Sequence, residues 1–228
     1  MIAIRRAEER GRIGRGPATS YLTFSCDQFI DPEHTGFRAL CAINEDVVLP
    51  DSGLAHDAGE SVEMLSCLLE GELDLVDDQG RRERLVPGTI ARTRAASCRL
   101  APAGGSRARM LQFWIRPGAG TRHPGPRRIA APADATRGVL RLIASPDGRD
   151  HSLALGQDTF VHAARLTHGD RLERPLPRDR HVWVQVLRGV VEVNGHVLTE
   201  SDGAAVSSEE CLALFARSDA EVWVVEMA

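Results

Sequence analysis

The sequence predicts an all-β protein built as two tandem antiparallel β-barrels, and three observations lead to this prediction. Short runs rich in β-branched and aromatic residues recur between Gly, Asp-Gly and Asn-Gly turns, without an amphipathic helix longer than about three turns. A strand-turn-strand pattern occurs twice along the chain. A segment rich in proline, glycine and arginine separates the two copies, as expected of a crossing between domains.

The expected strands share a high content of Val, Leu and Ile and are bounded by turn residues. The clearest of them cover residues 62–69, 73–76, 111–115, 182–187, 190–193 and 222–225. Hairpin turns are expected at residues 78–80 and 194–195, where Asp-Gln-Gly and Asn-Gly occur. Many short strands joined in this way are typical of a sandwich or a barrel.

The internal repeat supports two barrels of one kind. Residues 63–71 align with residues 181–189, and each segment is followed by a strand, a hairpin turn, a glycine and a strand that bears a tryptophan. The landmarks are Gly71, Gly80, Gly88 and Trp114 in the first copy and Gly189, Gly195, Gly203 and Trp223 in the second. The spacing from hairpin turn to the next landmark glycine is eight residues in both copies. We expect an N-terminal barrel over 1–120, a crossing over 121–137 and a C-terminal barrel over 138–228.

Composition excludes several classes of protein. The chain has 228 residues, 43% hydrophobic and 26% charged, which is ordinary for a globular protein. No apolar run approaches the roughly 20 residues that span a bilayer, and the first ten residues lack the apolar stretch of a secretory signal. A net charge of −4 gives no overall field that would attract nucleic acid. We therefore expect a cytoplasmic protein that binds neither membrane nor nucleic acid directly.

Two residue types have unusual distributions. All 28 basic residues are arginine, which we interpret as a coding bias toward GC-rich codons rather than as anion recognition. The five cysteines are scattered and form no CxxC pair, so neither a zinc site nor a disulfide framework is indicated. Cys67 and Cys98 are expected near the first barrel's cavity, as buried and inert thiols rather than nucleophiles.

The chain resembles the pirin family of bicupin proteins, and looks most like its bacterial branch, often described as quercetin 2,3-dioxygenase-like. The order and spacing of many segments carry the resemblance: 5–11, 20–25, 31–40, 43–47, 63–71, 111–117, 142–148, 182–189 and 201–203. It implies two cupin, or jelly-roll, domains and an N-terminal segment that reaches across to the second barrel. It also implies possession of one divalent metal, often iron, held in the N-terminal cupin by His-x-His, a later histidine and a glutamate.

This sequence departs from that ligand pattern. Counted back from Glu63 and Gly71, the two histidine positions fall on Asp57 and Gly59, and counted forward from Gly88, the later histidine and glutamate positions fall near Ala101 and Ala103. His56 is adjacent, but strand alternation turns it to the opposite face unless a β-bulge rotates it inward, and even then only two ligands result. We therefore expect no metal ligand, no cofactor and no catalytic residue.

The second barrel offers no substitute for these ligands. Its equivalent positions fall on Pro175, Pro177 and His181. A rearranged site could be built only from histidines that are more simply interpreted as core or surface residues. These are His162, His168, His181 and His196.

The vacated positions predict a ligand pocket in the N-terminal barrel. Its expected lining residues are Asp57, Gly59, Ser61, Glu63, Arg99, Ala101 and Ala103. Asp57 and Glu63 share strand parity, and two buried carboxylates need a partner or a proton. Our hypothesis is that Arg99, or else Arg94 or Arg109, pairs with one of them and replaces the charge of the metal. The alternative is that Asp57 lies in an exposed loop and needs no partner.

Three functions follow for a protein of this kind. The first is a non-catalytic module that binds a small molecule in the N-terminal barrel or a protein partner, with a regulatory role. The second is a quercetin 2,3-dioxygenase-like oxidoreductase that uses unexpected metal ligands. The third is a metal-independent cupin enzyme of the isomerase type, with Glu63 or a histidine as the base, although Glu63 is more simply structural.

Overall fold

The computed structural model describes residues 1–50, 52–118, 127–130 and 136–228, and the elements found there are strands and two short 3-10 helices. Most of the expected crossing over 121–137 lies outside the described residues. Two compact units divide the chain: Arg10–Thr121 with Gly125–Ala131, called the first barrel below, and Met1–Glu9, Arg122–Pro124 and Pro132–Ala228, called the second barrel. The nine residues at the start thus pack with the second barrel.

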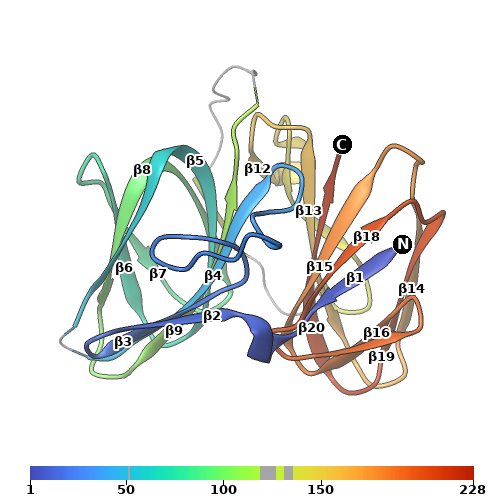
Figure 1. Ribbon diagram of the computed structural model, residues 1–228, viewed down its shortest axis with the longest axis horizontal. Helices are drawn as coiled ribbons and strands as arrows, with labels where there is room; N and C mark the ends of the chain where they lie inside the picture. The colour runs from blue at the N-terminus through green and yellow to red at the C-terminus, as the bar shows by residue number, and fades with distance from the viewer. Residues whose placement is uncertain (51, 119–126, 131–135) are drawn as a thin grey trace. The chain divides into compact units, whose positions relative to one another are not determined.

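The first barrel is one nine-stranded antiparallel sheet wrapped around a core (Figure 1). Its strands follow the order β2-β3-β4-β9-β5-β8-β6-β7, and β10 pairs with β8. Their bounds are β2 Gly11–Arg15, β3 Ala18–Leu22, β4 Leu40–Val48, β5 Leu54–Glu70, β6 Leu73–Asp77, β7 Arg82–Leu85, β8 Thr89–Pro102, β9 Ala108–Ile115 and β10 Arg128–Ala130.

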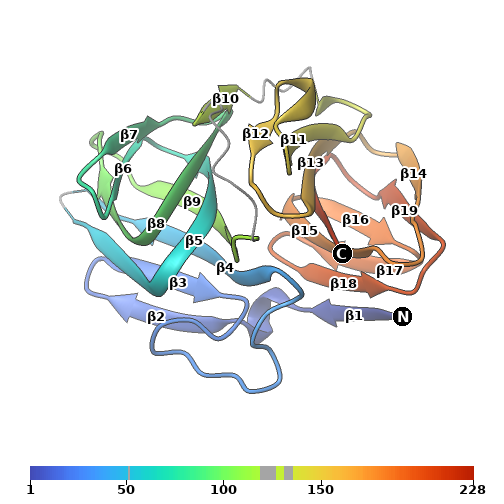
Figure 2. The same cartoon turned by 90° about the horizontal axis from the view of Figure 1, so that it is seen from above.

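The second barrel is built from a seven-stranded and a four-stranded sheet (Figure 2). The strand orders are β1-β18-β15-β20-β13-β11-β12 and β14-β19-β16-β17. The strand bounds are β1 Ile2–Arg5, β11 Arg141–Ser145, β12 Leu153–Ala154, β13 Thr159–Leu166, β14 Arg171–Pro175, β15 His181–Arg188, β16 Val190–Val193, β17 His196–Thr199, β18 Gly203–Ser207, β19 Cys211–Ala216 and β20 Ala220–Met227. The 3-10 helices are η1 Ala7–Glu9 and η3 Arg149–His151.

The all-β prediction is confirmed, and the repeat has a physical basis in two glycines. Gly71 and Gly189, at the ends of the aligned segments, have φ of +78° and +79°. A Cβ at Gly71 would lie 2.3 Å from the carbonyl oxygen of Arg107, and one at Gly189 would lie 2.1 Å from that of Asp219. Only glycine satisfies both requirements, because it adopts positive φ easily and leaves room for the neighbouring backbone.

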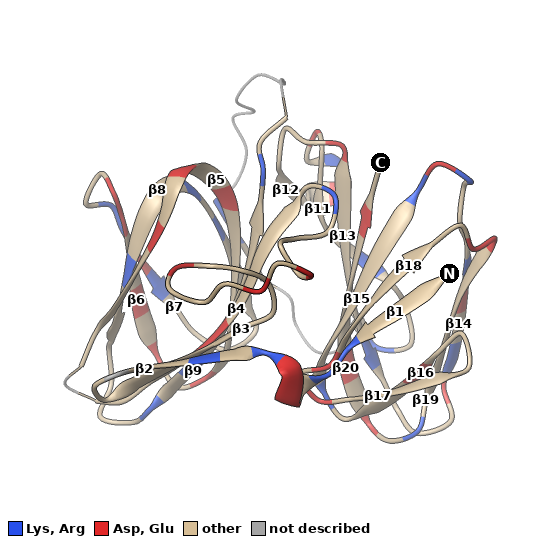
Figure 3. Ribbon diagram, viewed as in Figure 1, with Lys and Arg blue, Asp and Glu red and all other residues tan. Residues whose placement is uncertain are grey.

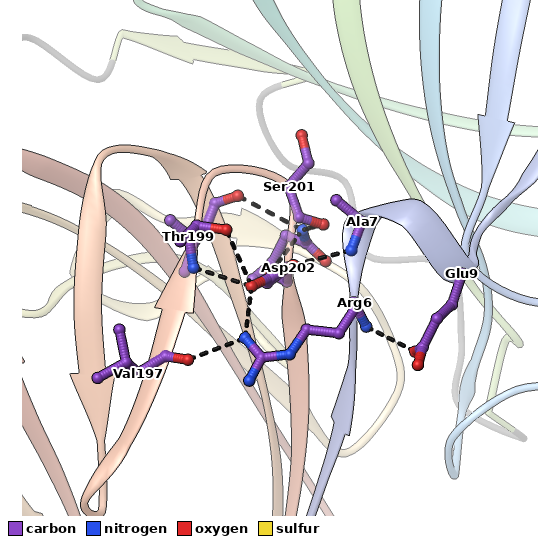
Figure 4. Close-up of polar contacts among 9 residues, drawn as sticks. Arg6, Ala7, Glu9, Val197, Thr199, Ser201 and Asp202 are labelled. Carbon is purple, nitrogen blue, oxygen red and sulfur yellow. Dashed lines mark hydrogen bonds and ion pairs between the residues drawn. The ribbon is translucent and has the colours of Figure 1, made fainter.

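A buried carboxylate anchors the N-terminal segment in the second barrel (Figure 4). Strand β1 pairs with β18, and directly after it Arg6 Nη1 and the backbone N–H of Ala7 donate to Asp202, at 2.9 and 2.8 Å. The backbone N–H and hydroxyl of Thr199 donate to the same side chain. Burial alone would raise the pKa of Asp202, but these hydrogen bonds, chiefly from Thr199 and Ala7, hold it below its ordinary value.

Charges of both signs are distributed over both units (Figure 3). Within the described residues, no helix has the length and apolar character required to cross a membrane.

Candidate functional site

Polar side chains occupy the inner face of the first barrel. Alternation along a strand places Asn44 and Asp46 on the same face of β4 as the core residues Ala42 and Val48. The same rule turns Ser20, His56, Ser66 and Gln112 inward from β3, β5 and β9, and all of these inward-facing polar residues are buried. Burying polar groups costs free energy unless they are hydrogen-bonded, so their arrangement is informative.

A chain of hydrogen bonds joins three of these residues. The Ser20 hydroxyl donates to Asp46 Oδ1 at 2.7 Å, and His56 Nε2 lies 2.9 Å from Asp46 Oδ2. All three side chains are buried, with His56 1% and Asp46 0% exposed. The rings of His56 and Trp114 make a T-shaped contact, with 5.6 Å between centroids. The imidazole is thus held on two sides.

Strand β5 contains a bulge, but its inward-facing residues, His56 among them, keep the same parity on both sides of it. His56 pairs with Cys98 and Asp57 with Ser97, yet Val62 already pairs with Ala95. The residues between Asp57 and Val62 therefore bulge out, with Gly59 at a φ of +69°. The expectation that strand alternation turns His56 away from the interior was wrong, because the even-numbered residues of β5, such as Leu54, Val62 and Met64, are the ones that face the core.

A second polar network lies beside this histidine. Gln112 Nε2 donates to the hydroxyl of Ser66 at 2.9 Å, and Trp114 Nε1 donates to Gln112 Oε1 at 3.4 Å. The thiol of Cys98 faces the same amide, and burial raises its pKa to about 12. Burial likewise raises the pKa of the Cys26 thiol to about 11. These thiols are protonated and inert at neutral pH, as expected for Cys98.

An open depression of about 650 Å³ lies over His56 and Cys98. Its lining comes from the loop before β4, from β5 and β8, and from the β6–β7 hairpin: Asp27, Ala55, His56, Asp57, Val76, Asp77, Asp78, Gly80, Ser97, Cys98 and Arg99. His56 and Cys98 are buried and form its floor, whereas Asp27, Asp57, Asp78 and Arg99 are exposed and form its rim. Sequence reasoning missed Asp46, whose link to His56 exists only in the folded barrel.

Two of the seven residues expected to line a pocket, Asp57 and Arg99, line this depression. Asp57 is exposed and accepts a hydrogen bond from the backbone N–H of Gly59 at 2.8 Å, as in the loop alternative considered above. The expectation that Asp57 faces inward was wrong, because Asp57 and Glu63 do share one face of β5 but that face is the outer one. Gly59 and Ser61 are exposed on the bulge, outside the lining of the depression.

The hypothesis that Arg99 neutralises a buried carboxylate was also wrong. Glu63 is buried, but it alternates with the core residues Val62 and Met64 and so lies on the outer face of the barrel. There it lies opposite Arg94, with 3.7 Å between Arg94 Nη1 and Glu63 Oε1. The register opposes Arg99 to Ala55, far along the strand from Glu63. Arg94, the less favoured partner, thus forms the ion pair.

The remaining predicted positions lie at the far end of β8. Ala101 pairs with Asp74 of β6, and the backbone N–H of Ala103 donates to the carbonyl of Glu72. Both are half-buried and lie outside the lining of the depression. The inward positions nearest His56 are instead Cys98, directly opposite it, and Leu100. Arg109, the other proposed partner, donates to Glu45 at 2.7 Å.

The histidines of the second barrel are dispersed. His162 is buried on β13, His181 Nδ1 lies 2.8 Å from the Ser207 hydroxyl, and His168 and His196 are exposed. Beside β13, the buried Glu226 accepts hydrogen bonds from Arg174 and Arg180, at 2.8 and 3.2 Å from the nearer nitrogen of each. Burial first, and the charge of Arg174 second, lower the pKa of His162 to about 4.

The side chains present do not fit the metal centre that the family resemblance implies. Within the described parts of the chain, no group of three or more His, Cys, Asp and Glu side chains is arranged to hold a metal ion. Nε2 of His56 is engaged by Asp46, and the nearby Cys98 is a protonated thiol. A stable site needs three or four converging donors in their deprotonated forms.

Two barrels of this build, in tandem in one chain, define a bicupin. A family model described as the quercetinase C-terminal cupin domain matches residues 142–227. A quercetin 2,3-dioxygenase of Escherichia coli K12 is 33% identical over 100% of this chain and 99% of its own length. A pirin-like protein of Caulobacter vibrioides is 28% identical over the full length of both chains.

Solved structures agree with the relatives found by sequence. The bacterial pirin YhhW from E. coli, in complex with nickel(II), superposes with a TM-score of 0.88 and 30% identity, covering 100% of this chain and 99% of that one. The chain belongs to the pirin family.

Proposed function

We propose that this protein is a pirin-family binding module that takes up a small molecule in the depression of its first barrel, without a resident metal and without dioxygenase activity. The observation that carries the proposal is the Asp46–His56 pair, which occupies Nε2 of the one histidine on the floor of the depression. A depression of about 650 Å³ falls in the size range of small-molecule sites. We extend the proposal to a regulatory role through a protein partner.

The second candidate is a quercetin 2,3-dioxygenase-like enzyme. It is favoured by the 33% identity to a relative of that name and by the structural similarity to a nickel-bound pirin. This candidate requires a metal held by donors that rearrange from their positions in the structure, and His56 would have to exchange Asp46 for the metal.

Metal content separates the two candidates. Inductively coupled plasma mass spectrometry on full-length protein, purified without a histidine tag or chelator, is expected to give near-zero iron, nickel, copper, manganese and zinc. Close to one equivalent of a single metal, lost in a His56→Ala variant but retained in His34→Ala, would overturn the proposal. His34 is the matched control because it also lies 2.9 Å from an aspartate, on a more exposed loop.

Ligand turnover provides the complementary test. Quercetin is added aerobically to the protein as purified and after incubation with nickel(II) or iron(II), while thermal unfolding and product formation are followed. The module predicts a raised melting temperature with no loss of quercetin. Consumption of quercetin that needs added metal and depends on His56 would establish the enzyme instead.

A further inference from the structure

We propose that three arginines on the outer face of the first barrel, Arg92, Arg94 and Arg127, form a binding site for a doubly charged phosphate group. None of the three lines the depression, so this site is a second function, independent of the first. Three features support it: the strands that bring the arginines together, the donors that two of them leave uncommitted, and the net charge of the group.

Two neighbouring strands bring these arginines together. Arg92 and Arg94 are two residues apart on β8 and alternate with residues of the core, so both point outward from the barrel. Strand β10 pairs with the same stretch of β8, and Arg127 directly precedes β10. The backbone N–H of Arg92 donates to the carbonyl of Arg127 at 2.7 Å. Arg127 therefore lies opposite Arg92 across the two strands.

Two of these guanidinium groups hold their carboxylates only loosely. Arg94 Nη1 lies 3.7 Å from Glu63 Oε1, and Arg127 Nη2 lies 3.6 Å from Asp77 Oδ2. Both distances exceed the roughly 2.7–2.9 Å of a charge-assisted hydrogen bond. Asp77 already accepts from Arg81, at 2.6 Å. A guanidinium carries five donors in a planar fork that matches phosphate, so the side chains of Arg94 and Arg127, 32% and 44% exposed, can still bind an anion.

The surroundings of Arg92 carry a surplus of positive charge. Burial lowers the pKa of this half-buried guanidinium, and the charges of Arg127 and Arg94 lower it further, against the opposing effect of Glu63. Three guanidinium groups and the one carboxylate of Glu63 leave a surplus of two positive charges. Arginine does not lose its proton in proteins, so an anion is what relieves this repulsion. A dianion neutralises the whole surplus, whereas a carboxylate neutralises half of it.

Isothermal titration calorimetry on the full-length protein tests the site with four probes: inorganic phosphate, phenyl phosphate, sulfate and benzoate. Phenyl phosphate and benzoate share a ring and differ in charge, whereas inorganic phosphate and phenyl phosphate distinguish a free ion from an ester. We expect phenyl phosphate to bind about tenfold more tightly than benzoate, because it can accept more charge-assisted hydrogen bonds. Its affinity should rise as the pH passes about 6, where a phosphate ester gains its second charge. The affinity of sulfate, which is doubly charged throughout, should not rise.

Variants then assign the binding to the three arginines. Arg92→Gln, Arg94→Gln and Arg127→Gln should each weaken the binding of phenyl phosphate about tenfold. Arg107→Gln is the matched control, because it removes a guanidinium of the same barrel that is 60% exposed and paired with Glu70 at 2.9 Å, and it should leave the affinity unchanged. If Arg92→Gln does not fold, Arg127→Gln tests the same site from an exposed position outside the strands.

Several results would overturn the phosphate site. They are equal affinities for phenyl phosphate and benzoate, an affinity for phenyl phosphate that does not rise with its second charge, or a loss in Arg107→Gln as large as that in Arg92→Gln. Tighter binding of the ester than of inorganic phosphate supports the site and identifies a phosphorylated molecule as its ligand, and the reverse order identifies the free ion. One equivalent of bound metal, or turnover of quercetin, contradicts only the function proposed for the depression.

Discussion

The two barrels share a sequence repeat, but their interiors differ in polarity. The inner faces of β15 and β20 in the second barrel carry Val182, Val184, Val186, Val222 and Val224, all of them fully buried. The inner face of the first barrel also has apolar residues, but it carries Asn44, Asp46, His56, Ser66 and Gln112 on β4, β5 and β9. Burying apolar side chains stabilises a fold, whereas burying polar side chains costs free energy. We infer that the polar side chains inside the first barrel serve a function.

The two buried histidines, His56 in the first barrel and His162 in the second, also differ in their surroundings. His56 is linked to a carboxylate that accepts from it and lines an open depression. His162 lies near Arg174 and Glu226, and those two pair with each other at 2.8 Å. We infer that the first barrel is the binding unit, and that the second stabilises the chain and holds its N-terminal segment.

The largest expected effect comes from placing a polar side chain in the apolar interior of the second barrel, compared with an apolar side chain in the polar interior of the first. Val224→Asn should destabilise the second barrel by about 3–4 kcal/mol, because it buries an amide among valines and removes apolar packing. Asn44→Val in the first barrel should change stability by less than about 1 kcal/mol, since it removes an acceptor that already lacks a partner. Chemical denaturation followed by fluorescence measures both. Equal losses would mean that the interiors do not differ in the way described here.

Substitutions at Gly71 and Gly189 test a feature that the two barrels share, a glycine at positive φ packed against a backbone carbonyl. Gly71→Ala and Gly189→Ala should each cost about 2–3 kcal/mol, because both introduce a Cβ at positive φ against a backbone carbonyl. Gly80→Ala, in the β6–β7 hairpin, is the control: its φ is also positive, at +76°, but no atom lies near its Cβ, so about 1 kcal/mol is expected. Calorimetric melting compares the three. Losses at Gly71 and Gly189 no greater than that at Gly80 would contradict the role of the close contact.

The smallest effect is a pH dependence confined to the second barrel. Burial lowers the pKa of His162 to about 4, so the folded state takes up this proton at a lower pH than the unfolded state does. The stability tied to neutral His162 is present above pH 6.5 and is lost as the pH falls toward 4, by about 2 kcal/mol at pH 5. A His162→Leu variant should lose this part of the pH dependence in urea titrations. His168→Asn, at an exposed histidine, should retain it.

Much of the fold could be predicted from the sequence because its signals are local. β-Branched runs between turn residues marked β5, β6, β9, β15, β16 and β20, and Asp-Gln-Gly and Asn-Gly marked two hairpins. Gly71 and Gly189 revealed the repeat, because each occupies a backbone position that admits no other residue without strain. These features depend on a few consecutive residues, so they can be read from the chain directly.

The candidate site depended on longer-range geometry. Along β5 the inward-facing residues keep one parity on both sides of the bulge between Asp57 and Val62, so His56 lies inside and Asp57 lies outside, like Glu63. On β8 the register shift inverts the parity: Ala91 and Ala95 face inward on one side of it, and Cys98 and Leu100 on the other. The register of β5 and β8 also places Arg99 opposite Ala55, far from Glu63, so that Arg94 is the ion-pair partner of Glu63. Strand parity carries a facing along a strand only while the ladder is unbroken, and one bulge inverts it.

By itself, the sequence determined the class of fold, the duplication and the lack of the expected histidine pattern, since each is written in residue types and spacings. The pairing of Asp46 with His56 was decided by the tertiary structure. These residues lie on β4 and β5, which β9 separates in the sheet, and they meet only because the sheet closes around a common interior. A hydrogen bond across a barrel depends on closure and register together, and no single stretch of the chain encodes both.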